Sequence, residues 1–141
     1  MRLDDGFSTI VGFADDPSVA FYEKEVTPPS MEGGGPNDTT TMRNTSLRTK
    51  APKLLKELGQ MTLVASYDPA VYSSVWDMIN NNQLITITFP EGDTYAFYGW
   101  LDSFKPNAIK EGEQPTAQIT IECSNQDDTG VETEPVYTAA P

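Results

Sequence analysis

The chain has 141 residues, with nine basic and 21 acidic side chains, no histidine and a formal net charge of −12. This length fits one domain with a sizeable core, and the acidity argues against specific nucleic-acid binding because such a surface repels phosphate. The lack of histidine excludes Ser-His-Asp and Cys-His catalytic sites, and the single cysteine excludes an internal disulfide framework.

The first predicted elements are two strands, at 7–13 and 19–27, separated by an Asp-Asp-Pro-Ser turn. Because strand side chains alternate with period two, one face of the second strand carries Val19, Phe21, Glu23 and Glu25. The face changes from apolar to acidic. This change suggests a strand that leaves the core and faces solvent or a lumen.

A polar, Thr-rich stretch at 33–56 follows, where a compact domain usually has a short turn. We expect it to lack regular structure by itself and to act as an assembly arm, because contacts with a neighbouring subunit would offset the entropy of ordering it. Residues 51–58 also allow a short helical turn with Pro52 near its start. Five of the nine basic residues lie in or just after the arm and would complement an acidic neighbour: Arg43, Arg48, Lys50, Lys53 and Lys56.

A strand at 61–67 precedes the one helix that the pattern predicts. Asp68 is a suitable N-cap, Pro69 suits the first helical position, and three asparagines at 80–82 suit the end. Spacing of i, i+4, i+7 and i+8 makes one apolar stripe of Val71, Val75, Met78 and Ile79.

Three more strands are predicted at 84–89, 94–104 and 116–123. The strand at 94–104 has apolar side chains on both faces, with Tyr95, Phe97 and Leu101 opposite Tyr98, Trp100 and Phe104. On the strand at 116–123 the inward set is Ala117, Ile119, Ile121 and Cys123, with Glu122 on the outward face. Residues 124–141 are acidic and aperiodic, and are either a disordered tail or a segment lying on a neighbour or an outer wall.

No motif names a reaction, and we expect no enzymatic activity. Cys123 lies on an apolar face and is interpreted as a core residue. A pair of carboxylates is not excluded by residue type, but none occurs in a cleft-forming context. The segment 125–130 begins like an EF-hand loop, but Val136 stands where the bidentate Glu belongs, so an ordinary turn is favoured and no metal site is predicted.

Five segments together resemble one protein family. They are PNDTTTMRNT at 36–45, RTKAP at 48–52, MTLVASYDPA at 61–70, ITITFP at 85–90 and AFYGWL at 96–101. In their order and spacing they resemble the major tail tube proteins of long-tailed, non-contractile phages (siphophages). The resemblance spans most of residues 7–123 and does not cover the segment that follows.

The resemblance implies a mainly β fold class, an antiparallel β-sandwich or partial barrel with one α-helix and a long inter-strand arm. It implies a tail tube domain at 1–124, with the arm at about 29–60, followed by an acidic tail at 125–141. The inter-subunit residues expected in the arm are Asp38, Thr39, Thr40, Thr41, Met42, Arg43, Asn44, Arg48 and Lys50. The candidates for a lumen-facing surface are Glu23, Glu25 and, less directly, Glu122.

The family would assemble as hexameric rings stacked into a tube that conducts DNA, built in the host cytoplasm as part of the virion tail. The implied partners are further copies of the chain and other tail proteins, namely the tape measure, terminator and distal tail proteins. DNA would be non-specific cargo, and neither a cofactor nor a membrane is expected. The alternatives are a tail terminator or tail-tip ring protein, and a carbohydrate-binding module in which Tyr72, Trp76 or Trp100 stacks on sugars.

Overall fold

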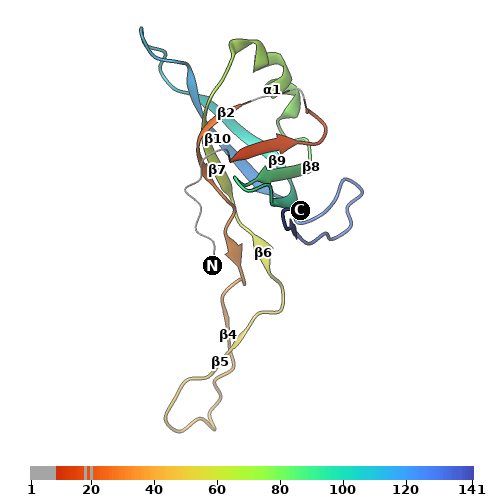
Figure 1. The fold of residues 1–141 in the computed structure, drawn as a ribbon. Helices are drawn as coiled ribbons and strands as arrows, with labels where there is room; N and C mark the ends of the chain where they lie inside the picture. The colour runs from red at the N-terminus through yellow and green to blue at the C-terminus, as the bar shows by residue number, and fades with distance from the viewer. Residues whose placement is uncertain (1–8, 18, 20) are drawn as a thin grey trace.

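The structure is a computed structural model that describes residues 9–17, 19 and 21–141. Within these ranges it is mainly β with one α-helix, and Figure 1 shows a long hairpin that projects from one end of the body. No helix in the described residues is long and apolar enough to cross a membrane. In chain order the elements are β1 (Ile10–Phe13), β2 (Tyr22–Thr27), β3 (Met31–Glu32), β4 (Pro36–Asp38), β5 (Lys50–Pro52), β6 (Glu57–Leu58), β7 (Met61–Ser66), the 3-10 helix η1 (Pro69–Val71), α1 (Tyr72–Met78), β8 (Gln83–Thr88), β9 (Thr94–Pro106), β10 (Thr116–Cys123) and β11 (Val136–Thr138).

The body is one antiparallel sheet in the order β1-β8-β9-β10-β7-β2. It is not closed into a barrel: β1 and β2 form its two edges in the described part of the chain. The long strand β9 pairs with β8 along its first half and with β10 along its second half. These features confirm the predicted fold class in being mainly β and antiparallel with one α-helix.

The core consists of side chains at alternate positions of the central strands, as the period-two pattern predicts. Ala117, Ile119 and Ile121 on β10 are fully buried, and β7 and β8 contribute their own alternate residues. Burying each large aliphatic side chain stabilises the fold by about 1.5–3 kcal/mol. The largest fully buried side chains are Met61, Leu63, Met78, Ile85, Ile87, Leu101, Ile119 and Ile121.

The helical segment begins and ends where the sequence predicts. The carboxylate of Asp68 accepts a hydrogen bond from the backbone N–H of Ala70 at 3.0 Å, and η1 then leads into α1. Val75 and Met78 are buried on the side of α1 that faces the sheet. Asn80 has φ +66°, the left-handed conformation that asparagine tolerates at a helix end.

A β-bulge in β9 changes the predicted faces of this strand. The pairing with β10 shifts register at Asp102, so residues on either side of it are one position out of phase. Phe104, which we expected beside Tyr98 and Trp100, therefore packs against the core. Its ring stacks on Phe21 with 6.0 Å between centroids.

A second bulge, at Lys24 of β2, separates two residues that were predicted to share a face. Glu23 pairs with Ala65 on β7, whereas Glu25 pairs with the adjacent residue, Val64. Directly paired residues of antiparallel strands point to the same side of the sheet. Glu23 therefore lies on the core side with buried Ala65, and Glu25 lies on the opposite side, so the shared face was a wrong prediction.

The projecting hairpin also differs from the prediction. We expected the stretch at 33–56 to lack regular structure and residues 51–58 to allow a helical turn. Instead β3 pairs with β6 and β4 pairs with β5, so both sides of the excursion are strands. The two sides therefore satisfy part of each other's backbone hydrogen bonding within the single chain.

The C-terminal segment contributes a strand to the sheet of its own chain. β11 pairs with β9 from Val136 opposite Ala96 to Thr138 opposite Thr94, beyond the end of β10. The hydroxyl of Tyr137 donates to Asp93 Oδ2 at 2.9 Å. The sequence pattern did not predict this strand.

Candidate functional site: the projecting arm

The candidate site is the arm, which we define as residues 29–60. Two short ladders hold it, β3 with β6 at the base and β4 with β5 farther out, and a loop at 39–49 forms the tip. In Figure 1 the tip lies at one end of the molecule, and α1 and the turn that joins β9 to β10 lie at the other. The two ends therefore present different surfaces.

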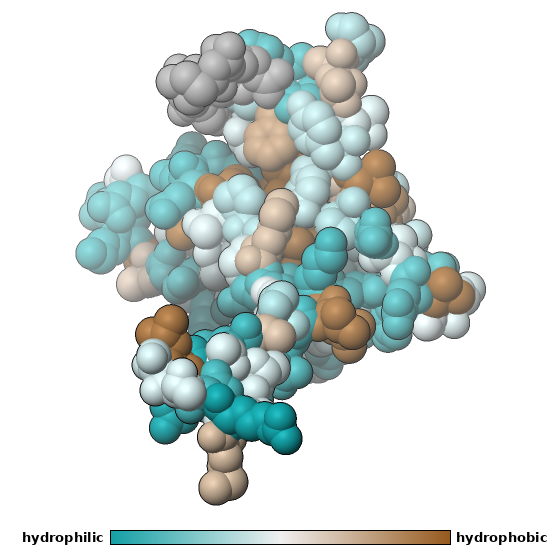
Figure 2. All heavy atoms as spheres, turned by 90° about the horizontal axis from the view of Figure 1, so that it is seen from below, coloured by the Kyte–Doolittle hydropathy of each residue, from teal (hydrophilic) through white to brown (hydrophobic). Residues whose placement is uncertain are grey.

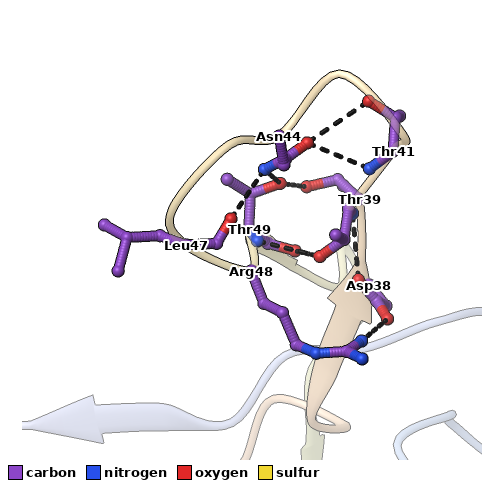
Figure 3. A network of polar contacts seen from close by, with 8 residues as sticks. Asp38, Thr39, Thr41, Asn44, Leu47, Arg48 and Thr49 are labelled. Atoms are coloured by element: carbon purple, nitrogen blue, oxygen red, sulfur yellow. Dashed lines mark hydrogen bonds and ion pairs between the residues drawn. The ribbon is translucent and has the colours of Figure 1, made fainter.

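Asn44 organises the tip of the arm (Figure 3). Its side-chain oxygen accepts from the backbone N–H of Thr41 at 3.0 Å and from the Thr41 hydroxyl at 3.2 Å. Its Nδ2 donates to the carbonyl oxygen of Leu47 at 2.9 Å and to Thr49 Oγ1 at 3.4 Å. One side chain thus fastens both sides of the loop.

Threonines close the loop below Asn44. The backbone N–H of Thr39 donates to the Thr49 carbonyl oxygen at 3.0 Å, and that of Thr49 donates to Thr40 Oγ1 at 2.9 Å. The Thr39 and Thr49 hydroxyls are hydrogen-bonded at 3.0 Å. Short hydroxyl side chains suit this role because they can bond to nearby backbone groups.

Asp38 begins the tip and is ionised more readily than an ordinary aspartate. The backbone N–H and the hydroxyl of Thr40 lower the pKa of its carboxyl group by hydrogen bonding, with the N–H to Oδ1 distance at 2.9 Å. Arg48 Nη1 lies 3.9 Å from Asp38 Oδ2, with both side chains largely exposed. Such an exposed ion pair contributes little to stability, so the hydrogen bonds fix the tip.

Large apolar side chains are exposed along the whole arm. Met42 is 104% exposed, Leu54 is 93% and Leu55 is 82%, and Met31 and Leu47 are also solvent-exposed. Figure 2, viewed from the arm side, shows hydrophobic groups surrounded by hydrophilic surface. Several large apolar side chains exposed on one projection favour an interaction surface.

The arm also differs from the body in charge. Residues 29–60 contain five basic and three acidic side chains, whereas the rest of the chain contains four basic and 18 acidic ones. The predicted arm residues from Asp38 to Lys50 all lie on the tip or the strands that flank it. Sequence reasoning missed Leu47, Leu54 and Leu55, although apolar residues in a polar loop were a usable signal.

The lumen candidates fall into two environments. Glu25 and Glu122 lie on the face of the sheet that points away from the core, and Gln60 Nε2 donates to Glu122 Oε1 at 2.6 Å. Lys105 lies on the same face. Glu23 lies on the core side, and its Oε1 accepts from the backbone N–H of Val11 on β1 at 3.1 Å.

The remaining reactive groups have structural environments. Burial, and then the charge of Glu122, raise the pKa of the Cys123 thiol to about 12. Asp127 Oδ1 accepts from the backbone N–H groups of Thr129 and Val131, which makes 125–130 a hydrogen-bonded turn. No group of three His, Cys, Asp or Glu residues that could hold a metal ion occurs among residues 9–17, 19 and 21–141.

The fold is shared with chains of two assembled particles. A chain from the virion of a native gene transfer agent particle matches with TM-score 0.66 and 10% sequence identity, over 97% of this chain and 100% of that one. A chain from a six-fold symmetrised anti-feeding prophage baseplate matches with TM-score 0.63 and 7% identity, over 99% and 96%. No protein-family model matches the sequence, and no curated protein matches it. At these identities the likeness defines the class of fold.

Proposed function

We propose that this chain is a structural virion protein that assembles as hexameric rings, stacked into a phage tail tube of the siphophage type. The observation that carries the proposal is the arm: a hydrogen-bonded projection whose large apolar side chains are exposed in the single chain. A protein that works alone gains nothing from holding such groups in water. Further copies of the same chain are the partner that would cover them.

The fold comparisons support a repeated assembly. Both similar chains come from multi-subunit particles, and one of these particles is described as six-fold symmetrised. A contact between two different surfaces of one subunit closes into a ring when the rotation permits, and a second such contact stacks the rings. The arm and the opposite end of the molecule are two different surfaces of this kind.

In this proposal the face of the sheet that carries Glu25 and Glu122 lines the bore. Carboxylates on that face would repel DNA phosphates, so the genome would be non-specific cargo that slides through. Glu23 shares the sheet but points to β1, so its role would be to hold the sheet together. The tape measure, terminator and distal tail proteins would be the other partners, and assembly would take place in the host cytoplasm.

Electron microscopy of the purified protein at rising concentration tests the proposal. We expect hollow tubes of uniform diameter from the wild type. Replacing Arg43 and Arg48 by Glu should leave the monomer folded and stop tube growth, because both side chains project from the tip. A wild-type protein that stays monomeric at all concentrations contradicts the proposal, and tubes of normal length from the double variant remove the arm from the mechanism.

A tail-tip or terminator ring is the second candidate, and the likeness to a baseplate chain favours it. Such a protein forms discrete rings that do not stack. The same micrographs distinguish the two, since single rings at every concentration would support the second candidate.

A further inference from the structure

The solvent side of α1 carries an exposed aromatic pair. The exposed positions of this helix are Tyr72, Ser73, Trp76 and Asp77, whereas Val75 and Met78 are buried. Tyr72 and Trp76 are four residues apart and therefore adjacent on one face. Trp76 is 78% exposed, which is unusual for the largest apolar side chain.

The same helical segment is purely acidic. Between Tyr67 and Asn82 the charged side chains are Asp68 and Asp77, and no lysine or arginine occurs. Asp77 lies in the last turn of α1, where the helix dipole disfavours a carboxylate, and that turn holds no basic residue. A cation supplied from outside would stabilise this position.

The tip of the arm presents the complementary groups. Met42 and Leu47 are exposed there, and Arg43 and Arg48 are the nearby cations. Methionine sulfur packs favourably against aromatic rings, and a guanidinium binds well over the face of a tryptophan. Arginine also pairs with carboxylate in a geometry that lysine cannot match.

We propose that the solvent face of α1 is the docking surface for the arm tip of a second copy of this chain. This inference rests on the proposed tube assembly and names the surface that the arm contacts. The arm and α1 lie at opposite ends of the molecule (Figure 1). The contact therefore joins two unlike ends, and each copy is shifted from the preceding copy along the long axis of the molecule. A contact of this type repeats without closing on two copies, and it is therefore the stacking contact.

The first test uses single substitutions on the helix. Trp76→Ala and Asp77→Lys should each raise the critical concentration for tube formation, measured by sedimentation, by at least about tenfold. Val131→Ala and Asp128→Lys are matched controls at other exposed positions and should leave it unchanged. Unchanged melting temperatures would show that all four variants fold. Tubes from Trp76→Ala at the wild-type concentration would overturn the inference and leave the aromatic face for another ligand, such as a sugar.

The second test is complementation. Asp77→Lys and the Arg43→Glu, Arg48→Glu double variant should each form no tubes alone at concentrations just above the wild-type critical concentration. An equimolar mixture should form them, because each kind of subunit then meets a partner of opposite charge at both of its ends. Failure of the mixture would overturn the pairing.

The wild type separates this inference from the function on which it rests. A wild type that never polymerises overturns both. Wild-type tubes together with normal tubes from Asp77→Lys overturn the docking surface and leave the tube intact.

Discussion

Replacing Asn44 with Ala tests whether the arm works because its tip is ordered before it binds. The substitution removes four hydrogen bonds, two accepted from Thr41 and two donated to Leu47 and Thr49. The side chains that we expect to touch a partner, such as Met42 and Arg43, are unchanged. Any loss of assembly would therefore come from loss of order.

The magnitude follows from the hydrogen bonds. At an exposed site each contributes at the low end of the usual range, about 0.5 kcal/mol, so the four together contribute about 2 kcal/mol. The apparent dissociation constant rises as the fraction of ordered tips falls. A loss of about 2 kcal/mol corresponds to a critical concentration up to about thirtyfold higher. The melting temperature should not change, because the tip makes no contribution to the core.

Two measurements check this prediction. Hydrogen exchange should accelerate at the amides of Thr41 and Thr49, which donate within the tip, and sedimentation should report the higher critical concentration. Thr45→Ala is the control, since it removes a neighbouring hydroxyl from the same loop. Faster exchange with unchanged assembly would refute the claim that prior order matters. Unchanged exchange would refute the role of Asn44 itself.

Three further predictions concern the body. Gly99→Ala should destabilise the fold by about 1–3 kcal/mol in a denaturant titration, because the added Cβ would meet the backbone of Glu122 and Cys123. Gly12→Ala is the control and should cause no such loss, because a Cβ added at Gly12 would meet open space. The Cys123 thiol, with its pKa raised to about 12, should react with a maleimide near neutral pH far more slowly in the folded protein than in denaturant. The hydrogen bond with Tyr72 raises the pKa of Tyr67 from 10.0 to about 12, so this group should lower the free energy of unfolding as pH rises from about 10 to about 12. Tyr67→Phe should lessen that fall, and an unchanged fall in the variant would exclude a contribution from Tyr67.

Local signals in the sequence predicted the helix and the central strands well. Asp68, Pro69 and the apolar stripe specify the helical segment through bonds and contacts within a few residues, and Asn80 marks its end. Ala117, Ile119 and Ile121 gave the inward face of β10 because an uninterrupted strand keeps its period.

The errors arose where pairing between distant segments decides the outcome. The bulges at Lys24 and Asp102 depend on how β2 pairs with β7 and how β9 pairs with β10. No residue type in β2 or β9 indicates that an extra residue will be inserted there. Each bulge reverses the faces beyond it, which moved Phe104 into the core and separated Glu23 from Glu25. The arm was misjudged for the same reason, since its two halves pair across the whole Thr-rich loop.

The hydrogen bond between Glu23 and Val11 joins the two edge strands of the sheet, β2 and β1. We call this junction the seam. Elsewhere adjacent strands are joined by ladders, whereas in the described residues this carboxylate joins β2 to β1, and Phe13 of β1 contacts Phe21, just before β2, edge to face. A single hydrogen bond to a charged group is worth about 1.5–3 kcal/mol, less than a ladder of several bonds. We therefore expect opening of the sheet to begin at this seam, before any of the ladders separates.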